Sequence, residues 1–113
     1  MKPGDIVLVR FPFTNLETTK KRPCLVLGSV SYSKTLQLVT VAMITSNIES
    51  LQLKGDIVMG DWKKARLLHP SLIRLSKVAT IEGELIEKKM GLLSSLDLKA
   101  VKKQFVNLFS DWL

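Results

Sequence analysis

The chain has 113 residues, with 17 Lys and Arg against 10 Asp and Glu, and a net charge of +7. This length fits one compact domain, residues 1–113, with one ordinary hydrophobic core. A single cysteine excludes an internal disulfide and a Cys-rich zinc site. No apolar run reaches the ~20 residues of a membrane span, and no secretory leader opens the sequence, so we expect a soluble cytoplasmic protein. The positive charge favours a polyanionic partner, whether RNA, DNA or an acidic protein.

Short apolar runs rich in β-branched residues recur through the first two-thirds of the chain and predict β-strands. They cover residues 5–11, 22–28, 36–45, 55–59 and 71–81. The first two runs are apolar almost throughout, which is typical of strands buried on both faces. In the last run, simple alternation would place Arg74 and Ser76 on one face of the sheet and Leu75 and Lys77 on the other.

The end of the chain has the apolar spacing of a helix, beginning at Leu96. The expected apolar stripe comprises Leu98, Val101, Phe105, Leu108, Phe109 and Trp112. Ser94 followed by Asp97 resembles a capping box. We expect the stripe to pack on the sheet, although part of it could equally contact a partner subunit.

A connector at residues 62–68 is predicted to make one or two helical turns, which end because Pro70 disfavours helix in the residue before it. Together with the five apolar runs and the terminal helix, this predicts a mainly β fold with a C-terminal α-helix. Short strands closed by one helix are typical of a small, curved antiparallel sheet or barrel.

Four segments, in order, carry a resemblance to a known family. They are GDIVLVRFPF at residues 4–13, KRPCLVL at 21–27, ITS at 44–46 and PSLIRLSKVAT at 70–80, followed by MGLLS at 90–94. With these segments the sequence resembles the MazF/PemK toxins of type II toxin–antitoxin systems, most closely the PemK-like branch.

The resemblance implies a small SH3-like β-barrel with a C-terminal helix, which forms a homodimer. It also implies an endoribonuclease that cleaves single-stranded RNA without a metal or cofactor. The expected protein partner is a cognate antitoxin, whose acidic tail would wrap the toxin and block the RNA groove.

RNA cleavage without a metal uses the ribose 2′-OH as the nucleophile, so the protein must move protons and stabilise charge on the phosphoryl oxygens. The resemblance places the family's catalytic arginine at Arg22 and its catalytic threonine at Thr45. A guanidinium suits charge stabilisation because it presents a planar fork of donors and stays protonated. For the same reason Arg22 is a poor general base.

Further residues are expected to contact RNA: Lys20, Lys21, Ser46, Trp62, Arg74 and Ser76. Lys20 and Lys21 form a basic cluster with Arg22, and the polar loop at residues 14–21 is a candidate lid over the RNA groove. Trp62 could stack on a base, although packing is the favoured interpretation. Arg74 is either paired within the barrel or directed at phosphate.

The general base is not identified by the sequence. Some family members carry an Arg, one intervening residue and an Asp in the fifth strand, and the matching residues here are Arg74, Leu75 and Ser76. A hydroxyl accepts a proton far less readily than a carboxylate. The lone His69 is a candidate because imidazole exchanges protons near neutral pH, but its position before Pro70, outside the family's motif, argues against it.

Three functions remain open at this point. The first is a dimeric, sequence-selective endoribonuclease with Arg22 acting at the scissile phosphate. The second, motivated by Ser76, is a catalytically inactive barrel that binds RNA or an antitoxin. The third is an interaction module, which would be favoured if Arg22 and Thr45 lay far apart.

Overall fold

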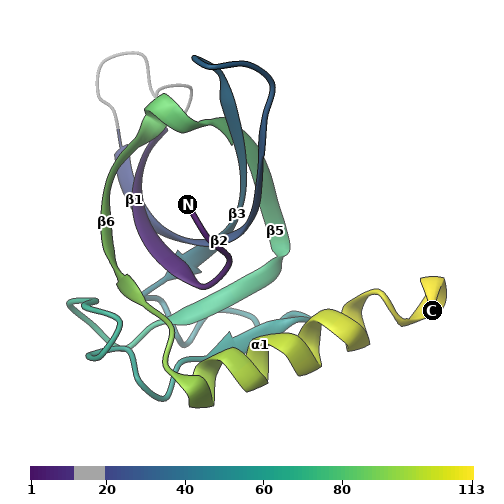
Figure 1. Cartoon of the computed structure of the whole chain (residues 1–113). Coiled ribbons are helices and arrows are strands. Elements are labelled where there is room, and N and C mark those ends of the chain that lie inside the picture. Colours follow the sequence, from purple (N-terminus) through teal and green to yellow (C-terminus); the bar gives the residue numbers. More distant parts are fainter. Residues whose placement is uncertain (12–19) are drawn as a thin grey trace.

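A computed structural model of the chain describes residues 1–11 and 20–113 (Figure 1). In these residues, six strands are followed by one helix, with two short 3₁₀ segments. The elements are β1 (Asp5–Phe11), β2 (Lys20–Ser31), β3 (Gln37–Thr45), β4 (Asp56–Val58), β5 (Leu72–Glu82), η1 (Gly83–Leu85), β6 (Ile86–Leu92), α1 (Ser95–Leu108) and η2 (Ser110–Trp112). Residues 14–19 of the expected lid lie outside the described residues.

The strands form one antiparallel sheet in the order β4-β5-β3-β2-β1-β6. Figure 1 shows this sheet curling around an interior, so that the fold is barrel-like, while β4 and β6 remain its two unpaired edges. The mainly β class with a C-terminal helix is therefore confirmed. The apolar runs did not predict β6, because three of its residues, Glu87, Lys88 and Lys89, are charged, as is common in edge strands.

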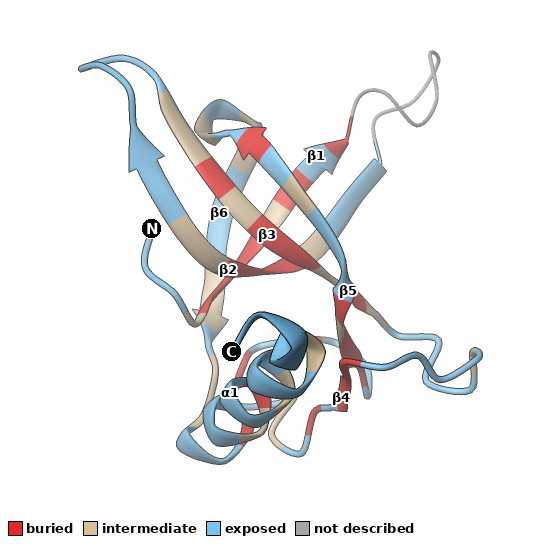
Figure 2. Ribbon diagram, turned by 90° about the vertical axis from the view of Figure 1, so that its right-hand side faces the viewer, coloured by how far each residue is buried: buried red, intermediate tan, exposed pale blue. Residues whose placement is uncertain are grey.

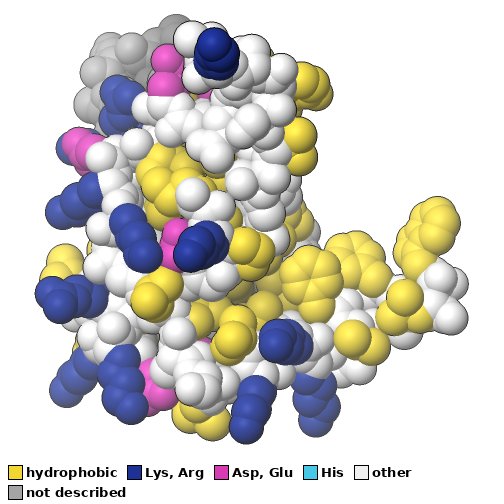
Figure 3. All heavy atoms as spheres, viewed as in Figure 1, with side chains coloured by type: hydrophobic (Ala, Val, Ile, Leu, Met, Phe, Trp, Pro, Cys, Tyr) yellow, Lys and Arg dark blue, Asp and Glu magenta, His cyan; other side chains and the backbone are white. Residues whose placement is uncertain are grey.

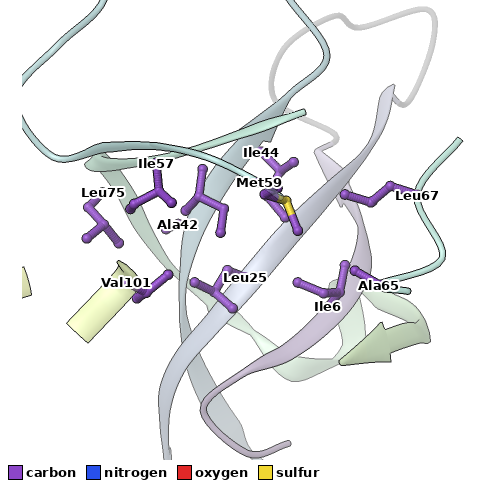
Figure 4. Close-up of a cluster of buried hydrophobic side chains, with 11 residues drawn as sticks. Ile6, Leu25, Ala42, Ile44, Ile57, Met59, Ala65, Leu67, Leu75 and Val101 are labelled. Atoms are coloured by element: carbon purple, nitrogen blue, oxygen red, sulfur yellow. The ribbon is translucent and has the colours of Figure 1, made fainter. Parts of the chain in front are cut away.

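The middle residues of β1, β2 and β3 are buried on both faces, as the sequence predicts for the first two of these strands. One face contributes to a core of 11 residues between the sheet, β4 and α1, which includes Ile6, Leu25 and Val101 (Figure 4). The opposite face forms a second cluster inside the curl, which includes Val7 and Cys24. Figure 2 shows the buried residues along these strands, with α1 lying beside the sheet.

Helix α1 begins as the sequence predicts, because the Ser94 hydroxyl accepts a hydrogen bond from the Asp97 amide at 3.2 Å. The Asp97 carboxylate does not complete a capping box. It accepts instead from the amides of Gly60 and Asp61, each at 2.9 Å, and so ties the first turn of the helix to the segment after β4.

The apolar stripe of α1 packs on the sheet only in part. Val101 is buried and Leu108 packs against the core, whereas Phe105, Phe109 and Trp112 are exposed. Figure 3 shows hydrophobic side chains along one side of the projecting helix and its end, with Lys side chains along the other. The stripe therefore packs on the sheet in part, and its exposed part remains available for the alternative contact with a partner subunit.

The connector at residues 62–68 forms turns rather than helix. The Ala65 amide donates to the Asp61 carbonyl at 3.1 Å, but Arg66 adopts a left-handed backbone with φ of 65°. This conformation ends any helical path after one turn. The segment therefore makes one turn of the one or two expected, and this turn ends at Arg66 rather than at Pro70.

Candidate functional site

Arg22 and Thr45 lie on neighbouring antiparallel strands, near the ends of their shared ladder. Cys24 of β2 pairs with Met43 of β3. If this register is carried two residues further along each strand, Arg22 comes opposite Thr45, and both side chains leave the sheet on the same face. The fold therefore brings these two residues, which are distant in sequence, to one place.

A surface hollow of about 400 Å³ opens at this place. Its lining includes Arg22 and Thr45, together with Arg74, Lys77 and Phe11. The described residues that line it include three cationic side chains and no carboxylate. We call it the Arg74 hollow.

A second hollow, of about 320 Å³, lies beside the first and shares Arg22, Ile44 and Thr45 with it. Its lining also includes Lys21, Ser46 and His69, and again no carboxylate from the described residues. We call it the His69 hollow. The two hollows meet where the predicted Arg22 and Thr45 stand, which brings both residues within reach of one bound ligand.

Arg74 is held within the fold by Asp56. Its Nε and Nη2 donate to the two carboxylate oxygens of Asp56, each at 3.0 Å, and Nη2 also donates to the Leu51 carbonyl at 2.8 Å and to Ser50 Oγ at 3.2 Å. Burial alone would raise the pKa of Asp56, but the hydrogen bonds from Arg74 and the Leu53 amide outweigh burial and lower that pKa from 3.8. The charge of Arg74 is thus largely compensated before any ligand binds.

Strand β5 contains a bulge that decides which of its side chains reach the Arg74 hollow. The register passes from Ala42 paired with Val78 to Met43 paired with Arg74, which leaves residues 75–77 as extra residues in β5. Lys77 lines the hollow, whereas Ser76 does not. The alternation expected for this strand, with Arg74 and Ser76 on one face, is therefore interrupted.

Two cations of the lining, Arg22 and Lys77, form no ion pair: no carboxylate oxygen of residues 1–11 and 20–113 lies within 4.0 Å of their charged nitrogens. Lys21, by contrast, donates to Glu87 of β6 at 2.8 Å. Lys77 was not singled out from the sequence, because its position in the hollow depends on the bulge. An anion entering the Arg74 hollow would therefore meet two cations that carry no counter-charge from the described part of the chain.

The Thr45 hydroxyl already takes part in a turn. Thr45 Oγ1 accepts a hydrogen bond from the Asn47 amide at 3.1 Å. This bond uses an oxygen lone pair and leaves the hydroxyl proton free to be donated. The turn orients the side chain at the junction of the hollows, so the turn interpretation and the functional interpretation are compatible.

Three of the residues predicted to contact RNA, Lys20, Trp62 and Ser76, line neither hollow. Lys20 is exposed at the start of β2 and lines neither of them. Trp62 packs against the core and carries the Lys63 ammonium 5.4 Å from its ring centroid. The structure gives Trp62 the packing role that the sequence favoured.

His69 lines the second hollow, although its sequence position argued against a role. The chain is anchored on both sides of His69, since Leu67 is buried in the core and Ser71 is buried as well. Ser71 Oγ donates to the His69 carbonyl at 2.8 Å, and the Met59 amide donates to the Ser71 carbonyl at 3.0 Å. His69 therefore belongs to a short, well-anchored connection.

Cys24 is the buried small hydrophobic residue that the sequence predicts. Burial raises the pKa of its thiol to about 12, against a smaller opposing effect of Arg22. A thiol of this kind is inert as a nucleophile at neutral pH.

Among residues 1–11 and 20–113, no three His, Cys, Asp or Glu side chains gather in a way that could hold a metal ion. No helix in the same residues is both long enough and apolar enough to span a membrane.

A family model described as PemK-like, MazF-like toxin of type II toxin-antitoxin system matches residues 2–109 of the chain. No curated protein matches the sequence.

Proposed function

Because the chain belongs to the PemK-like, MazF-like toxin family of type II toxin–antitoxin systems, we propose that it is a metal-independent endoribonuclease acting on single-stranded RNA. The observation that carries the proposal is the meeting of Arg22 and Thr45 at the junction of two hollows whose described lining is cationic and free of carboxylates. Such a lining favours a phosphodiester backbone over a neutral or cationic ligand.

In the proposed reaction, the 2′-oxygen attacks the adjacent phosphorus and the 5′-oxygen leaves. Arg22 stabilises the negative charge that grows on the phosphoryl oxygens through a fork of donors, with which no carboxylate of the described residues forms an ion pair. Thr45 donates its free hydroxyl proton to the same phosphate while the Asn47 amide holds its oxygen in place. Lys21, Ser46, Lys77 and Arg74 bind the flanking strand.

The test compares purified wild-type protein with Arg22→Ala on single-stranded RNA, in buffer containing a metal chelator. Wild type should yield 2′,3′-cyclic phosphate and 5′-hydroxyl ends, and Arg22→Ala should cleave about 10²–10³-fold more slowly. Lys103→Ala, which removes a charge from an exposed position of α1, should cleave like wild type. Cleavage that requires added magnesium would contradict the mechanism.

The alternative is a barrel that binds RNA or an antitoxin without cleavage. It is favoured by the position of Ser76, which replaces the carboxylate of some relatives and lines neither hollow. In that case, wild type and Arg22→Ala would differ in salt-sensitive RNA binding, and neither would release product.

We further propose a cytoplasmic homodimer that is neutralised by an acidic antitoxin. Phe105 of α1 and, beyond its end, Phe109 and Trp112 have exposed apolar side chains. They support a self-association surface, since large apolar patches mark interfaces. Light scattering should give twice the chain mass for wild type and a monomer for Phe109→Ser/Trp112→Ser. The antitoxin's acidic segment is expected to compete with RNA for the cationic hollows.

A further inference from the structure

Cleavage by 2′-OH attack requires two proton movements that Arg22 and Thr45 do not supply. The 2′-OH must lose a proton as the O2′–P bond forms, and the 5′-oxygen must gain one as the P–O5′ bond breaks. Arg22 remains protonated, and a neutral threonine hydroxyl is a weak base. A further group near the junction of the two hollows is therefore required if the proposed function holds.

The described lining of the two hollows narrows the choice to one side chain. Its titratable residues are Lys21, Arg22, Arg74, Lys77 and His69. The first four are ordinarily cations at neutral pH, whereas neutral imidazole carries a nitrogen lone pair that accepts a proton. Cys24 is buried, with the pKa of its thiol raised to about 12 by burial, and lines neither hollow.

The position of His69 suits this role. It shares its hollow with both Arg22 and Thr45, and its backbone is held through the Ser71 hydroxyl and the burial of Leu67. The charged groups that face it there are Lys21 and Arg22 of β2, while β1, β3 and β6 contribute the uncharged Leu8, Thr45 and Met90. Glu87 does not line this hollow and is paired with Lys21 at 2.8 Å.

We propose that the His69 imidazole is the proton acceptor for the 2′-OH. The neutral ring takes the 2′-proton while the O2′–P bond forms, and the P–O5′ bond breaks as the 5′-oxygen takes a proton from water. The imidazolium then returns its proton to solvent, so that the overall reaction isomerises the RNA into a cyclic phosphate and a 5′-hydroxyl without consuming water. The inference rests on the proposed function and adds a base that the family's motif does not provide at Ser76.

Single-turnover cleavage of a short RNA by wild type, His69→Ala, His69→Gln and Arg22→Ala tests the inference. Both His69 variants should be slowed about 10²-fold or more, with RNA affinity kept, because glutamine retains hydrogen bonding but cannot accept the proton. Free imidazole should restore part of the rate of His69→Ala and none of the rate of Arg22→Ala.

Three results would overturn the inference. If both His69 variants cleave RNA within about threefold of the wild-type rate, His69 does not accept the proton. A wild-type rate in His69→Gln alone would show that a hydrogen bond suffices. If the wild-type protein does not cleave RNA, the proposed function itself is overturned. If wild type and both His69 variants cleave while Arg22→Ala does not, only the inference about His69 is overturned.

Discussion

Arg74 and Asp56 form a two-point ion pair between the neighbouring strands β5 and β4. Each of the two N–H···O contacts is 3.0 Å long, and the Asp56 side chain is only 1% exposed. Arg74 also donates to the Leu51 carbonyl. One guanidinium therefore holds the chain before β4 against β5 at the edge of the Arg74 hollow.

Replacing Asp56 with Asn should destabilise the protein strongly, because Arg74 would keep its charge in a partly buried site without a carboxylate. Removing one partner of such a pair costs about 3 kcal/mol in the free energy of unfolding, measured by urea denaturation. The matched control is Asp61→Asn, whose contact with Lys64 is 3.9 Å long and partly exposed. It should change stability by no more than about 0.5 kcal/mol, and equal effects of the two changes would contradict the prediction.

Asp56 of this pair, together with Asp5 of β1, makes the stability of the fold depend on pH in the acidic range. Burial alone would raise the pKa of Asp5 and Asp56, but hydrogen bonds outweigh it and lower both pKa values from 3.8. The donors are Lys2 and Lys89 for Asp5, and Arg74 and Leu53 for Asp56. A lowered pKa in the folded state stabilises the fold above 3.8, and this contribution is lost as the pH falls through 3.8 toward the folded values. Urea midpoints should therefore drop between about pH 5 and pH 2, and Asp56→Asn should flatten the decline.

The parts of the fold that the sequence predicts are those determined by local pattern. Residues 5–11 match β1 residue for residue, since both faces of that strand are buried and it is preceded in the sequence by Gly4 and followed by Pro12. The start of α1 is likewise set locally, by Ser94. Strand β6 has no such local pattern, because its stability comes from pairing with β1.

The site was less accessible to sequence reasoning. Arg22 and Thr45 were found through the family resemblance, and their convergence depends on the β2–β3 register. Asp56 gave no signal, because its role arises only where β4 pairs with β5 at Arg74. The position of His69 outside the motif argues against a role, yet His69 lines the hollow that Arg22 and Thr45 share.

Gly91 in β6 should tolerate no side chain. A Cβ at this position would lie 2.6 Å from the Ala65 carbonyl oxygen, which belongs to backbone and cannot rotate away. Gly91→Ala should cost about 1–3 kcal/mol in the free energy of unfolding. Gly28→Ala is the matched control, because a Cβ there meets nothing within 4 Å. If the two alanine variants melt together, the close packing of β6 on the connector is wrong.

Asp97 should matter more for stability than the cap of its own helix. Its carboxylate is 2% exposed and accepts from the amides of Gly60 and Asp61. Asp97→Ala leaves both amides without this acceptor and should cost about 2–4 kcal/mol, whereas Ser94→Ala removes one cap bond and should cost about 1 kcal/mol. Thermal and urea unfolding of the two variants give the comparison, and a larger loss for Ser94→Ala would contradict it.

Substitutions of Thr45 test whether its hydroxyl acts on phosphate or only shapes a turn. Thr45→Val keeps the side-chain volume but loses both the proton it would donate and the oxygen that accepts from the Asn47 amide. Thr45→Ser keeps both. Loss of the turn bond alone costs about 1 kcal/mol of stability, so both variants stay folded at 25 °C if the protein has ordinary stability. Single-turnover cleavage by Thr45→Val should fall by about 10–10²-fold, the scale of a lost transition-state donor, while Thr45→Ser stays near wild type. A folded Thr45→Val that cleaves at the wild-type rate would confine this residue to the turn and leave Arg22 as the phosphate ligand at the junction.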